Sequence, residues 1–74
     1  MEVEIRLFAG LRDGRFKRRS STLAEGTRLR DVVRELSIAE QEVSLPLVNG
    51  EYSPLDRELR GGDVVSLFPA VGGG

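Results

Sequence analysis

One segment of this 74-residue chain has the spacing of an amphipathic helix, and it restricts the possible folds more than any other feature. Over residues 28–36, apolar side chains recur at intervals of three and four, as they do along one helix face. These side chains are Leu29, Val32, Val33 and Leu36. Thr27 is the expected N-cap, because its hydroxyl can accept from an unpaired amide of the first turn. Residues 37–44 are mostly polar and are expected to form a loop.

The N-terminal part of the chain has the period of two that is typical of strands. In residues 2–8, EVEIRLF, apolar residues alternate with charged ones until Phe8, which falls on the charged face. Asp13-Gly14 then predicts a turn. Residues 15–24 are strand-like by position but rich in charged and hydroxyl side chains. Such a strand suits the edge of a sheet, where Lys and Arg discourage pairing with other chains.

The C-terminal part predicts a hairpin followed by a final strand. A short apolar run at residues 45–48 ends in Asn49-Gly50, a dipeptide that favours the two-residue type I′ turn. Residues 51–59 are expected to return as a short strand and a loop. Gly61-Gly62-Asp63 forms a tight turn into the last strand, residues 64–68.

This order of elements places one helix across one face of a mixed sheet, which is an α+β roll of the β-grasp type. We expect about four to five strands, with the first and last strands adjacent and parallel. The predicted core consists of the inward residues of strands and helix: Val3, Ile5, Leu7, Leu29, Val32, Val33, Leu36, Val65 and Leu67. Residues 1–69 would form this domain, and residues 70–74 a flexible C-terminal Gly-Gly tail.

Composition excludes several classes of function. The chain contains no Cys and no His, so it has no thiolate nucleophile, no imidazole base and no ordinary zinc site. A self-sufficient enzyme is not expected, and neither is a bound metal. The net charge of −1 does not favour nucleic-acid binding, and the basic residues 15–19 are interpreted as edge protection. The apolar runs are too short to span a membrane, so a soluble cytoplasmic protein is expected.

The three terminal glycines contribute nothing to a core, because glycine has no side chain to bury. Such a run can be an expression scar or a frayed end. The alternative is a thin projecting tail that reaches a buried site in another protein, since residues without Cβ fit a narrow channel. The remaining motifs favour this second interpretation.

These features together resemble the MoaD/ThiS family of ubiquitin-like sulfur carrier proteins. The motifs that carry the resemblance are IRLFAGLRDG at residues 5–14, VNG at 48–50, LRGGDVVSLFP at 59–69 and the terminal Gly-Gly. The LFAxLR opening combined with the GDxVxLFPxVxGG ending is closest to the small subunit of molybdopterin synthase. Ala70 stands where that branch commonly has a second proline, and Gly72 where another residue is usual.

The resemblance implies a chemistry that takes place at the chain terminus. An E1-like adenylyltransferase, using ATP and magnesium, would convert the carboxylate of Gly74 into an acyl-adenylate. Sulfur from a persulfide donor would then displace AMP and leave a thiocarboxylate. The large catalytic subunit of molybdopterin synthase would receive the tail, with Gly72 and Gly73 keeping it thin, and pass the sulfur to a pterin precursor. The chain itself would bind no cofactor.

A surface for these partners is expected beside the tail. Phe8 and Phe68 both point away from the helix by alternation and are placed on the open sheet face near the start of the tail. Tyr52, just after the hairpin turn, would extend this patch, and Val71 would contribute from the tail.

Two alternatives remain open at the level of sequence. One is a sulfur carrier for thiamine or another sulfur-containing metabolite, and the other is a ubiquitin-like modifier joined through Gly74 to lysines of other proteins. A plain interaction module without terminal chemistry is the third possibility, and it predicts that deleting Gly73 and Gly74 has no effect.

Overall fold

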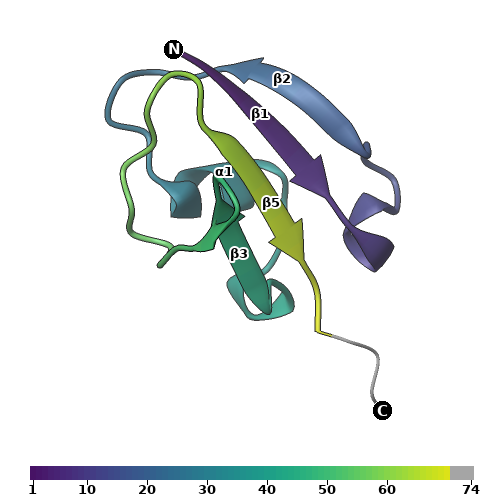
Figure 1. Cartoon of the computed structure of the whole chain (residues 1–74). Coiled ribbons are helices and arrows are strands. Elements are labelled where there is room, and N and C mark those ends of the chain that lie inside the picture. The colour runs from purple at the N-terminus through teal and green to yellow at the C-terminus, as the bar shows by residue number, and fades with distance from the viewer. Residues whose placement is uncertain (71–74) are drawn as a thin grey trace.

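The computed structural model describes residues 1–70, which form a five-stranded mixed sheet with one α-helix across one face (Figure 1). The elements in chain order are β1 Glu2–Leu7, the 3₁₀ helix η1 Ala9–Arg12, β2 Arg18–Thr22, α1 Leu29–Glu35, the 3₁₀ helix η2 Glu40–Glu42, β3 Leu45–Val48, β4 Glu51–Tyr52 and β5 Val64–Phe68. The predicted α+β class and the order of strands around one main helix are confirmed. The predicted tail residues Val71, Gly72, Gly73 and Gly74 lie outside the described residues, so the boundary at residue 70 stays a prediction.

The strand order is β2-β1-β5-β3-β4, so the first and last strands of the chain are neighbours. β1 and β5 run parallel with Ile5 opposite Val65 and Leu7 opposite Leu67, while the other pairs are antiparallel. β2 lies at one edge of the sheet, as its polar sequence predicted. This topology brings the C-terminal ends of β1 and β5 to the same end of the sheet.

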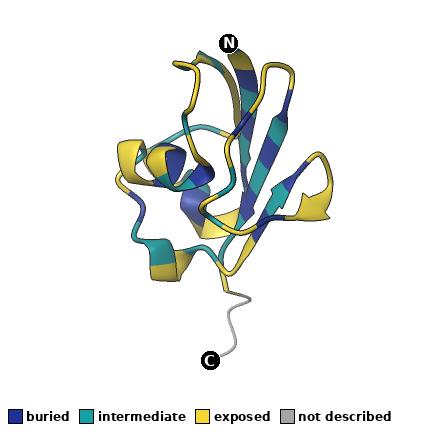
Figure 2. Cartoon of the chain, turned by 90° about the vertical axis from the view of Figure 1, so that its left-hand side faces the viewer, coloured by how far each residue is buried: buried dark blue, intermediate teal, exposed yellow. Residues whose placement is uncertain are grey.

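The core lies between α1 and the face of the sheet that it covers, and buried residues alternate along the strands (Figure 2). Eight of the nine predicted core residues are buried, but Leu36 is only partly buried at the end of α1. Further core residues come from segments without clear periodicity: Leu11, Ile38, Val48 and Leu59. Leu36 is the C-cap residue, where the helix ends, and Ile38, two residues later, is buried instead.

The hairpin turn between β3 and β4 has the predicted geometry. Asn49 and Gly50 have φ angles of 54° and 83°, which matches the positive φ that a type I′ turn needs at both positions. The Asn49 side chain also donates to Asp63 Oδ1 at 3.0 Å and accepts from the Val64 amide at 2.9 Å. The turn is thereby tied to the start of β5.

The predicted N-cap of the helix is wrong. The N-cap residue is Arg28, and the Thr27 hydroxyl donates instead to the Ala24 carbonyl at 2.7 Å. Arg28 forms an isolated antiparallel bridge with Glu58, which keeps its backbone extended and delays the first turn by one residue. The Arg28 amide donates to the Asp31 carboxylate at 2.9 Å, so an acidic side chain of the first turn stabilises the helix start.

Two segments expected as loops contain short 3₁₀ helices. η1 follows β1 directly and inserts Leu11 into the core, and Gly14 then has a φ of 69° in the predicted Asp13-Gly14 turn. η2 occupies part of the expected loop 37–44. None of the helices formed by residues 1–70 is long and apolar enough to cross a membrane.

Candidate functional site

The start of the tail is fixed to the end of β5. The Phe68 carbonyl accepts from the Ser44 amide at 2.9 Å, and the preceding Leu67 carbonyl accepts from the Phe8 amide at 3.2 Å. Pro69 follows and has no amide to continue the ladder, and Ala70 is exposed. The chain therefore leaves the sheet directly beside Phe8 and Phe68.

Phe8 and Phe68 form a stacked pair on the open face of the sheet. Their ring centroids are 4.1 Å apart with an interplanar angle of 8°, and both side chains are partly buried. The Arg12 guanidinium lies 5.4 Å from the Phe8 centroid, and its Nε donates to the Leu7 carbonyl at 2.7 Å. Both aromatic residues therefore lie beside the start of the tail, as alternation predicts, and their role in binding a partner stays a prediction.

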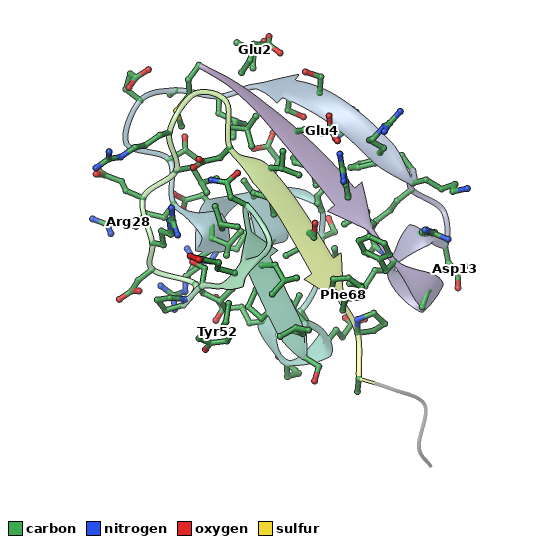
Figure 3. The ribbon with its side chains drawn as sticks, viewed as in Figure 1. Glu2, Glu4, Asp13, Arg28, Tyr52 and Phe68 are labelled. Atoms are coloured by element: carbon green, nitrogen blue, oxygen red, sulfur yellow. The ribbon has the colours of Figure 1, made fainter. Side chains whose placement is uncertain are left out.

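The apolar surface extends from this pair toward the opposite edge of the sheet. Leu45 is directly opposite Phe68 and is 42% exposed, although sequence reasoning did not assign it to the site. Tyr52 is 67% exposed and is opposite Leu47, with β3 between it and β5 (Figure 3). Tyr52 thus shares the face with Phe68 but lies about two strand spacings, roughly 10 Å, from β5. Val71, the remaining predicted contact, lies outside the described residues.

Basic side chains gather on the other side of the aromatic pair. Arg6, Arg12, Lys17 and Arg18 line a hollow together with Phe8, and we call these five residues the cationic hollow. Arg6 and Arg18 are directly opposite each other across β1 and β2, and Glu4 forms an ion pair with Arg6.

The basic stretch 15–19 divides into residues with different structural roles. Arg15 donates to the carbonyls of Leu36 and Ser37 at 3.0 and 3.2 Å, so it stabilises the C-terminal end of the helix. The Arg19 guanidinium lies 4.2 Å from the centroid of Phe16. Lys17 and Arg18 are exposed and belong to the cationic hollow.

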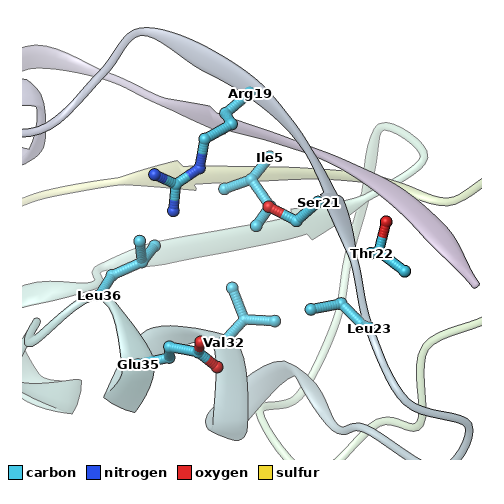
Figure 4. A pocket seen from close by; sticks show the side chains of 8 residues that line it. All are labelled: Ile5, Arg19, Ser21, Thr22, Leu23, Val32, Glu35 and Leu36. Atoms are coloured by element: carbon cyan, nitrogen blue, oxygen red, sulfur yellow. The ribbon is translucent and has the colours of Figure 1, made fainter.

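A second hollow of about 200 Å³ lies between β2 and α1 (Figure 4). Its apolar lining includes Ile5, Val32 and Leu36, and Arg19 and Glu35 stand at its rim. It opens on the helix side of the sheet, away from the stacked aromatic pair. We therefore assign the candidate site to the open face.

One carboxylate of the open face, that of Glu2, has a lowered pKa. The hydroxyls of Thr22 and Ser20 each donate to this carboxylate at 2.7 Å and hold the pKa of Glu2 below its usual value. The hydrogen bond from Thr22 is the larger of the two causes.

Within residues 1–70, no group of three or more Asp or Glu side chains has the arrangement of a metal site. The described residues form a surface that is apolar on one side and cationic on the other, at the point where the tail begins.

Comparisons with known proteins give a consistent result. The model of the ThiS family matches residues 5–74. Among solved structures, a putative molybdopterin converting factor, subunit 1, from Pyrococcus furiosus is 32% identical with a TM-score of 0.75, covering 96% of this chain and 99% of that chain. No curated protein sequence matches the chain.

Two further solved structures are similar over the whole of both chains. One is a complex of subunits 1 and 2 of the molybdopterin-converting factor from Helicobacter pylori 26695, with 27% identity and a TM-score of 0.67. The other is SAMP1 from Haloferax volcanii, whose 23% identity and TM-score of 0.79 show the shared fold. The predicted β-grasp fold is confirmed.

Proposed function

The chain belongs to the ThiS family, and from that premise we propose that it carries sulfur as a thiocarboxylate on Gly74 for molybdopterin synthesis. The observation that carries the proposal is the family match, which runs through the terminal glycines to residue 74. The molybdopterin branch is supported by the 32% identity to the Pyrococcus furiosus protein. The fold of this chain is that of the ubiquitin-like sulfur carriers.

The proposed chemistry requires a free α-carboxylate on Gly74. A carboxylate oxygen attacks the α-phosphorus of ATP, pyrophosphate leaves, and the acyl-adenylate forms in a partner adenylyltransferase that binds ATP and magnesium. A persulfide sulfur then attacks the acyl carbon and AMP leaves. A thiol cleaves the resulting acyl disulfide and releases the thiocarboxylate. The carrier acts as a substrate and not as the catalyst.

The described residues support this role through the start of the tail. The backbone bonds of Leu67 and Phe68 hold the end of β5 against Ser44 and Phe8, so the tail starts from a fixed point. A partner that binds the stacked aromatic pair therefore also orients the tail. Aromatic residues near the centre of an interface often contribute about 2 kcal/mol or more to binding.

A large catalytic subunit is the proposed acceptor of sulfur. The Helicobacter pylori relative was solved as a complex of subunit 1 with subunit 2. We place the corresponding contact of this chain on Phe8, Phe68 and the neighbouring Leu45, with Tyr52 at its margin. The same surface would meet the adenylyltransferase, so the two partners would bind in turn.

Mass spectrometry of the purified chain tests the proposal. The chain is incubated with an adenylyltransferase from the same cell, ATP, magnesium and a persulfide donor. We expect a species heavier by the difference between one sulfur and one oxygen atom, which is absent without the adenylyltransferase. Deleting Gly74, or adding one residue after it, should abolish this species while circular dichroism shows an intact fold.

The same spectra distinguish the alternatives. Adducts of much higher mass would indicate conjugation to proteins through Gly74. Sulfur transfer by a chain that still carries a C-terminal extension would refute the proposed chemistry. A thiocarboxylate that the large synthase subunit does not accept would point to thiamine or another metabolite.

A further inference from the structure

We propose that the cationic hollow is a docking site for an acidic surface of the adenylyltransferase, and that it accelerates the encounter between the two proteins. This inference rests on the proposed function and adds a second recognition element beside the aromatic pair. It concerns the charges of Arg6, Arg12, Lys17 and Arg18, which lie around Phe8.

The position of the cationic hollow links it to the tail. β1 and β5 are parallel neighbours, so Arg6 and Phe8 lie at the same end of the sheet as Phe68. Phe8 belongs both to the cationic hollow and to the stacked pair. A partner that covers the start of the tail therefore extends over the basic side chains with no gap between the two surfaces.

The charges of the cationic hollow are poorly compensated within the molecule. Glu4 pairs with Arg6, but among residues 1–70 no carboxylate lies within ion-pair distance of Arg12, Lys17 or Arg18. The whole chain has a net charge of −1, so this excess of positive charge is local. A local field of one sign is the condition under which an oppositely charged partner is attracted.

The pairing of β1 with β2 makes this arrangement unfavourable for the fold alone. Arg6 and Arg18 are directly opposite on the open face, and like charges at opposite positions destabilise a sheet. Basic side chains on β2 itself protect that edge, and this protection does not require a further one on β1. Arg15 and Arg19 have intramolecular contacts, whereas the exposed Lys17 and Arg18 are directed to the cationic hollow.

An acidic protein surface fits the cationic hollow better than a nucleic acid does. The Phe8 ring is stacked on Phe68 and covered by Arg12, so it does not offer a platform for a base. The adenylyltransferase must meet and release the carrier repeatedly. Complementary charges raise the rate of such encounters more than they raise the final affinity.

Two double variants with the same change in net charge provide the test. Lys17→Glu with Arg18→Glu reverses two charges of the cationic hollow. Arg34→Glu with Arg60→Glu reverses two exposed charges elsewhere, one on α1 and one before β5 at the end of the sheet opposite Phe68. Stopped-flow measurements give the association rate constant with the adenylyltransferase between about 0.05 and 0.5 M NaCl, where the Debye length shortens from above to below about 10 Å.

We expect the Lys17→Glu/Arg18→Glu chain to associate about tenfold or more slowly at low salt, with a weaker dependence on salt than the wild type. The Arg34→Glu/Arg60→Glu chain should stay within about twofold of the wild type. Given excess enzyme and time, the Arg34→Glu/Arg60→Glu chain should reach the wild-type yield of thiocarboxylate.

Each contrary outcome is distinct. Equal slowing of both double variants, or of neither, overturns the docking site while leaving the proposed function intact, provided that the wild-type chain is adenylated. Failure of the wild-type chain to be adenylated by this enzyme overturns both. Tight, salt-sensitive binding of a short DNA or RNA duplex by the wild type, lost in the Lys17→Glu/Arg18→Glu chain, would assign the cationic hollow to nucleic acid instead.

Discussion

The two faces of the sheet are built by alternate residues of the same strands and differ in almost every property. Toward α1, the strands present aliphatic side chains such as Ile5, Val65 and Leu67, which are at most 3% exposed. On the open face, the residues next to them in sequence include Arg6 and Phe68, which are charged or partly exposed. The covered face maintains the fold, and the open face is available for partners. Substitutions at two adjacent positions of one strand should therefore differ in effect: the one on the covered face should lower stability, and the one on the open face should weaken partner binding.

The largest expected effect lies on the covered face. Leu67→Ala removes a fully buried side chain and should lower the free energy of unfolding by about 2–5 kcal/mol. That is a large part of the stability of so small a domain. Urea denaturation measures the change. Leu45→Ala is the matched control, because Leu45 is 42% exposed and its truncation should cost less than about 1 kcal/mol. Equal losses at the two leucines would contradict the contrast between the faces.

A substitution at Phe68, the residue after Leu67 on β5, should affect binding more than folding. Phe68→Ala removes the stacked partner of Phe8, and we expect affinity for the adenylyltransferase and for the large synthase subunit to fall by about 2 kcal/mol. The fold should survive with a loss of about 1 kcal/mol, since Val65 and Leu67 fill the covered side of the strand. Calorimetric titration against each partner measures the first effect, and circular dichroism controls for the second. Unchanged affinities, or an unfolded chain, would refute the assigned role.

An intermediate effect is expected at the end of the helix. Leu36 is only partly buried and also lines the hollow between β2 and α1. Leu36→Ala should therefore cost about 1–2 kcal/mol, less than truncation of a fully buried leucine. Urea denaturation compares the loss of stability in Leu36→Ala with that in Leu29→Ala, since Leu29 is fully buried on the same helix. If the two losses agree, Leu36 belongs to the core as its spacing predicts.

The difference at Leu36 illustrates what sequence periodicity can and cannot predict. Apolar side chains recur every two residues in a strand and every three to four in a helix because of local backbone geometry. These periods therefore predict the strands, the helix and most of the core. Thr27 is not the N-cap because a tertiary contact, the bridge between Arg28 and Glu58, keeps Arg28 extended and makes it the N-cap residue. Leu11 and Ile38 are buried in or near segments without a repeat, so no pattern identified them.

The candidate site divides in the same way. Alternation placed Phe8 and Phe68 on the open face, and the parallel pairing of β1 and β5 made them neighbours. Leu45 was missed because a short apolar run does not show which of its faces is open. The cationic hollow combines side chains from β1, from η1 and from residues 17–18 at the start of β2, and the register of β1 against β2 sets Arg6 opposite Arg18.

The smallest expected effect tests a carboxylate of the open face. Thr22 and Ser20 donate to Glu2, so the pKa of Glu2 is lower in the folded chain than in the unfolded chain. A group of this kind contributes stability above its unfolded pKa, about 4.3 for glutamate, and the contribution is lost as the pH falls through the lower folded pKa. Glu2→Gln cannot titrate, so its urea midpoint should fall less steeply than that of the wild type below about pH 4.3. Glu51→Gln on β4 is the control, since Glu51 is exposed and its side chain has no hydrogen bond within residues 1–70. Because Glu2 is exposed to water, the difference should be small, and parallel curves for wild type and Glu2→Gln would show that the two hydroxyls do not couple its charge to folding.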